Sequence, residues 1–138
     1  MHFLVGSFQM PSTDPQSVLT IHDMVRANRG LSQAAIVDDS GGEMGYGQFY
    51  ELIVRTVGTL NSAGYRRGDR IALSLPDGAL AGAAIASLTS GFTVIPINPG
   101  QTPSEYGRYL PDLKARAIVT LGGCSSAARD VAAGMGLE

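Results

Sequence analysis

Positive charge is scarce in this chain, and the scarcity excludes one class of partner. The 138 residues include 10 Lys and Arg against 12 Asp and Glu, which leaves a net charge of −2, and Lys114 is the single lysine. A surface that follows a phosphate backbone needs an excess of basic side chains on one face. The composition therefore argues against a nucleic-acid partner.

Cysteine and histidine are almost absent as well. With Cys124 as the single cysteine, no internal disulfide can form, which fits a reducing cytoplasm or makes redox state irrelevant. Neither His2 nor His22 has a second histidine or a cysteine at metal-ligand spacing. We therefore predict no metal site, and we expect a cytoplasmic protein.

Long uninterrupted hydrophobic runs are also missing. Residues 1–17 start with an apolar stretch but lack the basic region and cleavage site of a secretory signal, so we interpret them as an N-terminal extension. Residues 78–104 carry no charge, yet glycines and prolines interrupt them at Gly82, Gly91, Pro96 and Pro99. A buried helix followed by a buried strand is expected there, not a membrane span.

The first half of the sequence predicts a capped helix, a β-hairpin and a long helix. Thr20, with Asp23 three residues later, predicts the N-cap of a short helix that ends near Gly30, and residues 34–46 predict the hairpin. Residues 47–64 predict an amphipathic helix. Its apolar stripe consists of Phe49, Leu52, Ile53, Thr56, Val57 and Leu60.

Short apolar strands then alternate with helices. Strands are expected at residues 70–75, 93–98 and 117–121, and helices at 79–90, from the Thr102 cap onward, and at 127–136. This order implies an α/β fold with a mostly parallel sheet, right-handed crossovers and helices on both faces. Ligands of such sheets bind at the carboxyl ends of the strands, so the loops PDG, NPGQT and GGCSS are expected on the functional edge. One domain accounts for the chain.

Recognisable catalytic motifs are lacking. The turn GGEMGYG does not have the spacing of a dinucleotide loop, and LGGCSS follows a strand and opens a helix but has no phosphate-loop lysine. We interpret Ser125 there as a helix N-cap. No paired-carboxylate cleft, nucleophile elbow or Ser/His/Asp set is visible. By pattern alone, a noncatalytic interaction module and a flavodoxin-like ligand-binding domain remain open.

Three segments resemble the N-terminal portion of the adenylate-forming enzymes, which include acyl-CoA synthetases, luciferases and nonribosomal peptide adenylation domains. The segments are residues 44–78, 86–100 and 109–120. The residues that match the family motifs are Tyr46, Glu51, Leu52, Gly68, Asp69, Arg70, Pro76, Gly91, Pro96, Asn98 and Pro99. One departure is Asp77, where the family usually has Asn, and we expect it to cap the following helix.

The resemblance implies that residues 18–138 are an incomplete N-terminal subdomain of an ATP-dependent carboxylic acid ligase. Such an enzyme would use ATP, Mg²⁺ and CoA, and would transfer the acyl group to CoA or a carrier thiol. The family's lysine-bearing phosphate loop, ribose-binding aspartate and C-terminal lysine are not found here, so the chain alone is expected to be inactive and to contain no catalytic residue. The alternative is a noncatalytic truncated paralogue or an interaction module with the same fold.

Two further expectations follow from the resemblance. Arg129 lies where the acetyl-CoA synthetase branch has arginines that contact CoA phosphates, although Ser126 stands near the place of the second arginine. A solvated arginine that pairs with Asp130 or another neighbour is the alternative. Because part of the sheet and its apolar helices would be uncovered, we also expect a homo-oligomer. Pro96 is expected where the sheet needs a bend or lacks a donor.

Overall fold

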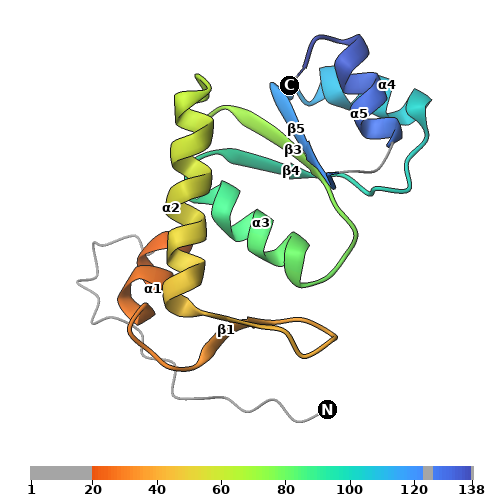
Figure 1. The fold of residues 1–138 in the computed structure, drawn as a ribbon. Coiled ribbons are helices and arrows are strands. Elements are labelled where there is room, and N and C mark those ends of the chain that lie inside the picture. The colour runs from red at the N-terminus through yellow and green to blue at the C-terminus, as the bar shows by residue number, and fades with distance from the viewer. Residues whose placement is uncertain (1–19, 123–125, 138) are drawn as a thin grey trace.

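A computed structural model describes residues 20–122 and 126–137, so the 1–17 extension, Cys124 and Ser125 lie outside the described residues (Figure 1). In chain order the elements are α1 (Ile21–Asn28), β1 (Ala34–Val37), β2 (Glu43–Gly45), α2 (Tyr46–Ser62), β3 (Arg70–Ser74), α3 (Ala79–Thr89), β4 (Thr93–Pro96), α4 (Pro103–Asp112), β5 (Ala117–Thr120) and α5 (Ala127–Gly134). The predicted order of elements is confirmed.

The N-terminal helix and hairpin pack against one end of α2. The Thr20 side chain accepts a hydrogen bond from the Asp23 N–H at 3.1 Å, and the Asp23 carboxylate accepts one from the Thr20 N–H at 3.2 Å, so the predicted capping box forms. Strands β1 and β2 pair antiparallel. Phe49 and Ile53 from the predicted stripe of α2 are buried here, together with Val25.

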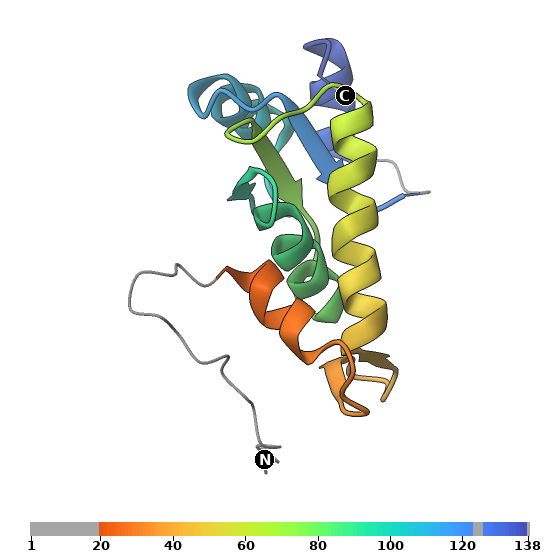
Figure 2. The same cartoon turned by 90° about the vertical axis from the view of Figure 1, so that its left-hand side faces the viewer.

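The central sheet is parallel, with strand order β4-β3-β5. Helices α2 and α3 lie on one face and α4 and α5 on the other, as Figures 1 and 2 show. Successive side chains of β3 point to opposite faces of the sheet. Ile71 packs with α3 and Phe92, whereas Ala72 packs with α4 and α5. Both residues have no exposed surface. The predicted layered α/β architecture is therefore confirmed.

Pro96 lies on the outer side of β4 and costs the sheet no hydrogen bond. The Thr93 N–H donates to the Asp69 carbonyl at 2.9 Å, and the Ile97 N–H donates to the Leu73 carbonyl at 2.8 Å. Because N–H groups alternate in direction along a strand, the Pro96 nitrogen points away from β3. Pro96 was expected either at a bend of the sheet or at a position without a hydrogen-bond donor. The second reason applies, because the sheet needs no N–H group at this position.

One predicted helix cap is wrong, and another lies outside the described residues. Helix α3 begins after Gly78, which has a φ of +133°, and no side chain caps it, so Asp77 does not have the expected role. Only glycine adopts that conformation at little cost, so the backbone turn sets the start of the helix. Helix α5 is capped by Ser126, whose Oγ accepts a hydrogen bond from the Arg129 N–H at 3.1 Å, and Ser125, the expected cap, lies outside the described residues.

Candidate functional site

A cavity of about 320 Å³ lies at the carboxyl ends of β3 and β4, on the edge where the sequence predicts ligand binding. It is bounded by the loops that follow these strands and by α3. The lining residues are Leu73, Leu75, Asp77, Ala81, Ile85, Pro96, Ile97, Asn98 and Pro99. One carboxylate and one amide are the polar side chains in this set, so the cavity can position an apolar group but does not provide a nucleophile with a base.

The loop after β4 is held in place by its own hydrogen bonds. The Asn98 side-chain oxygen accepts from the Gly100 N–H at 2.8 Å, which closes a turn. The Tyr106 hydroxyl donates to the Asn98 carbonyl at 3.1 Å and lies 2.6 Å from the Ser74 Oγ at the end of β3. Tyr106 is 1% exposed. This buried network connects α4, β3 and the NPG loop, and the sequence patterns did not reveal it.

Arg129 lies in the first turn of α5, as predicted, and its guanidinium reaches the carboxyl end of β5. Nη2 donates to the Leu121 carbonyl at 2.6 Å and to Thr120 Oγ1 at 3.4 Å. Within the described part of the chain, Nη1 and Nε have no hydrogen-bond partner, and no ion pair joins Arg129 to Asp130. Arg129 does not line the cavity near β3 and β4. The guanidinium is therefore anchored through one nitrogen, with two nitrogens left to meet an anion.

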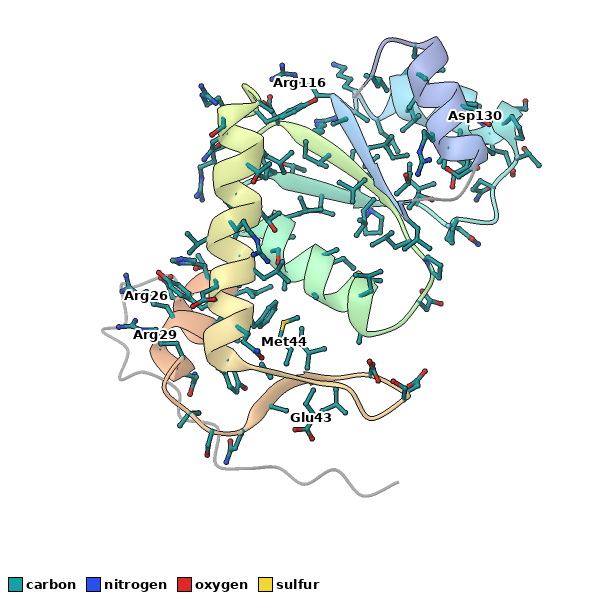
Figure 3. All side chains as sticks on the ribbon, in the orientation of Figure 1. Arg26, Arg29, Glu43, Met44, Arg116 and Asp130 are labelled. Atoms are coloured by element: carbon teal, nitrogen blue, oxygen red, sulfur yellow. The ribbon has the colours of Figure 1, made fainter. Side chains whose placement is uncertain are left out.

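A charged cluster that the sequence did not reveal lies at the opposite, amino end of the sheet. The Asp69 carboxylate accepts from the Arg66 N–H at 2.7 Å and from Arg116 Nη1 at 2.5 Å. Figure 3 shows Arg116 next to the C-terminal end of α2, and its guanidinium lies 5.3 Å from the centre of the Tyr65 ring. The Arg116 hydrogen bond, followed by the Arg66 N–H, holds the pKa of Asp69 below its usual value. This cluster joins the starts of β3 and β5 and has a structural role.

No metal site is visible in residues 20–122 and 126–137: these ranges hold no group of three or more His, Cys, Asp or Glu side chains in ligand-like proximity. No helix within the same ranges is long and apolar enough to cross a membrane.

Comparisons with known proteins found a matching family model and several solved structures with a similar fold. A family model described as AMP-binding enzyme matches residues 25–136. The fold is similar to VinN in complex with L-aspartate (TM-score 0.69, 22% identity, 81% of this chain and 30% of that chain). It is also similar to a fatty acyl CoA synthetase of Mycobacterium tuberculosis (TM-score 0.64, 19% identity, 86% and 24%).

A third similar structure is a nonribosomal peptide synthetase with α-methyl-L-serine-AMP bound (TM-score 0.68, 22% identity, 80% of this chain and 13% of that chain). The chain thus spans less than a third of the length of each of these three proteins. Identities at this level show a shared fold. No curated protein sequence matches the chain significantly.

Proposed function

Because this chain belongs to the AMP-binding enzyme family, we propose that it forms the N-terminal portion of an ATP-dependent carboxylic acid ligase. The parent enzyme would form an acyl-adenylate and pass the acyl group to CoA or to a carrier thiol. The observation that carries the proposal is the family match over residues 25–136, and the shared fold supports it. The parent would use ATP and Mg²⁺, as the adenylate-forming family does.

The residues present do not fit a nucleoside triphosphate. The single lysine, Lys114, lies in the turn between α4 and β5, at the amino end of the sheet, with a φ of +52°. The cavity at the opposite edge is lined by one carboxylate, Asp77, and by no basic side chain. A polyphosphate there would meet no cation to offset its charge. We therefore assign the nucleotide chemistry to the remainder of the parent and a framework role to this chain.

Two observations test the proposal. Exchange of labelled pyrophosphate into ATP, measured with the isolated chain and a broad panel of carboxylic acids, should stay at background. Reproducible acid-dependent exchange would show that the chain is itself an adenylating enzyme. In the source gene, the reading frame after Glu138 should encode a Ser/Thr/Gly-rich phosphate loop with a lysine. A stop codon directly after Glu138 would favour a noncatalytic module.

Within the parent, Arg129 is proposed to contact a phosphate of CoA. Its anchoring to the Leu121 carbonyl supports this role, because the anchor limits the freedom of the guanidinium and leaves Nη1 and Nε without a partner among the described residues. The N-terminal end of α5 adds a favourable field for an anion. In the full-length enzyme, Arg129→Ala should raise the KM for CoA and leave adenylate formation unchanged.

Arg108→Ala is the matched control for that experiment. Arg108 is an exposed arginine on the neighbouring helix α4, where it stacks on the Tyr109 ring. Its replacement should leave the KM for CoA unchanged. If Arg129→Ala leaves the CoA dependence unaltered, or reduces adenylate formation to the same extent, the arginine does not belong to the CoA site.

A further inference from the structure

Two loops at the amino end of the sheet carry half of the positive charge of the chain. Residues 65–70 lead into β3 and residues 111–116 lead into β5; we call them the basic loops. Together they hold two acidic residues and five of the ten basic ones, namely Arg66, Arg67, Arg70, Lys114 and Arg116. All five basic residues are exposed. The rest of the chain holds five basic and ten acidic residues, so the positive charge is concentrated in these loops.

Hydrogen bonds hold the basic loops side by side. The Arg116 N–H donates to the Arg70 carbonyl at 2.8 Å, and Arg70 Nη1 donates to the Leu113 carbonyl at 3.0 Å. Arg116 Nη1 also binds the Asp69 carboxylate, so this acid is already paired. The cations of both loops therefore lie on one surface, and Asp112 is the second acid of the loops.

The other segments that end at this edge add no charge. They are the C-terminal end of α2, the connection from α3 to β4, and the C-terminal end of α5, which correspond to residues 59–64, 87–93 and 131–137. The surface around the basic loops is therefore positive without a neighbouring acidic segment to offset it.

Three of the arginines are fixed through one nitrogen. Arg66 Nη1 donates to the carbonyls of Asn61 and Tyr65 at 2.6 and 2.7 Å, and Arg70 and Arg116 also bind the protein through Nη1. Within the described part of the chain, Nη2 and Nε of these three arginines have no hydrogen-bond partner. A guanidinium held in this way loses little side-chain freedom when its remaining nitrogens bind a carboxylate.

Lys114 occupies a backbone position that glycine normally fills. Among the described residues it is the single non-glycine residue with a positive φ, +52°. The Lys114 N–H donates to the Pro111 carbonyl at 2.9 Å and the Ala115 N–H to the Leu110 carbonyl at 3.0 Å, which forms the turn that ends α4. A lysine is less favourable than glycine in this conformation. Its presence therefore costs some stability and adds a fifth cation to the surface.

We propose that the basic loops bind a partner protein through a short acidic segment of that partner. This inference goes beyond the proposed function and does not depend on it. Four of the five cations are arginines, whose planar guanidinium pairs with a carboxylate through two hydrogen bonds. The loops lie at the ends of strands, so a further strand that paired along either edge would lie beside the sheet and not over them.

The charge distribution favours a short acidic segment over a long polyanion or a lipid surface. Outside the basic loops the chain has ten acidic and five basic residues, so a nucleic acid or an anionic bilayer that extended past the loops would meet repulsion. A bilayer also needs apolar side chains that can insert, and the exposed large hydrophobic residues all lie outside residues 65–70 and 111–116. A short run of carboxylates can reach the cations without either penalty.

Fluorescence anisotropy of a labelled peptide with a run of glutamates, titrated with the 138-residue chain, tests the proposal. The same peptide with glutamines in place of the glutamates is the negative control. The glutamate peptide should bind and the glutamine peptide should not, and binding should weaken as the salt concentration rises. Arg67→Gln and Lys114→Gly should each raise the dissociation constant about threefold, and the double variant should raise it about tenfold.

Arg26→Gln is the matched control for Arg67→Gln. Arg26 is an exposed arginine on α1, and Figure 3 shows it well away from Arg116. Its loss changes the net charge by the same amount, yet it should leave the dissociation constant within about 1.5-fold, because salt screens charges at that separation. Lys114→Gly separates binding from folding. It relieves the positive φ, so its urea midpoint should equal or exceed that of the unmodified chain while its binding is weaker.

Three results would overturn the proposal. The first is a glutamate peptide that binds no more tightly than the glutamine peptide. The second is equal weakening by Arg26→Gln and Arg67→Gln, because the net charge and not the basic loops would then control binding. The third is tighter binding of phosphatidylserine vesicles or of a single-stranded oligonucleotide than of the glutamate peptide, which would assign the loops to a phosphate surface.

Discussion

Removal of the Tyr106 hydroxyl, a single oxygen atom, should lower the free energy of unfolding substantially, because this group makes two hydrogen bonds. In Tyr106→Phe, the ring stays in place while the hydrogen bonds to Ser74 Oγ and to the Asn98 carbonyl are lost. Ser74 is 5% exposed, so water cannot readily replace the lost partner. The change acts at the end of β3 and at the NPG loop, which form the edge that contains the cavity.

The magnitude follows from the number of groups left without partners. A typical internal hydrogen bond contributes about 1 kcal/mol, and a buried polar atom left unsatisfied costs about 1–3 kcal/mol. Tyr106→Phe should therefore lower the free energy of unfolding by about 2–3 kcal/mol. Ser74→Ala, which leaves the bond to Asn98 intact, should cost about 1 kcal/mol. In the double variant the two effects should overlap by about 1 kcal/mol, since the shared bond is lost only once.

Urea unfolding, followed by circular dichroism at a concentration that keeps the chain monomeric, measures these differences through the transition midpoint. Tyr109→Phe is the matched control, because Tyr109 lies on the same helix and, among the described residues, its hydroxyl accepts one hydrogen bond, from the exposed Arg108 at 3.1 Å. It should cost less than about 0.5 kcal/mol. If the effects of Tyr106→Phe and Ser74→Ala are fully additive, the two residues do not interact and the reasoning is wrong.

Three smaller predictions follow from single contacts. Gly91→Ala should destabilise the chain by about 1–2 kcal/mol in urea unfolding, because the added Cβ would lie 3.1 Å from both methyl groups of Val57; an unchanged midpoint would show that α2 adjusts freely. Thr102→Ala should cost about 1 kcal/mol through loss of the α4 capping box, measured in the same way. The lowered pKa of Asp69 contributes stability that is present above the unfolded pKa of about 3.9 and is lost as the pH falls through the folded value. Asp69→Asn should therefore flatten the acid limb of a midpoint-against-pH curve, and an acid limb equal to that of the unmodified chain would contradict the assignment.

Local elements could be read from the sequence because neighbouring residues determine them. The capping boxes at Thr20 and Thr102 each need only a hydroxyl and an acid three residues apart, and both form. The stripe on α2 follows the helical period, and its buried members are those that the spacing predicts. The family resemblance is likewise contained in short ordered segments, and the match over residues 25–136 confirms it.

Gly78 shows where a local pattern was insufficient. Asp77 is an acceptable cap residue, but helix α3 begins after Gly78, whose φ of +133° sets the turn into the helix. A sequence pattern cannot distinguish adjacent candidates when the deciding contacts come from other elements.

Some features of the candidate site could be predicted from the sequence, and others depended on the tertiary structure. The sequence by itself determined the parallel sheet and the place of Arg129 in a first helical turn, and it predicts ligand binding at the carboxyl ends of the strands. Only the tertiary structure decided the strand order β4-β3-β5, which places Pro96 on one outer edge and leaves Val119 on the other. It also decided that Arg129 binds the end of β5 and not Asp130. The physical reason is that strand order and side-chain partners depend on contacts between residues far apart in the chain, and the periodicity of a segment contains no information about its distant neighbours.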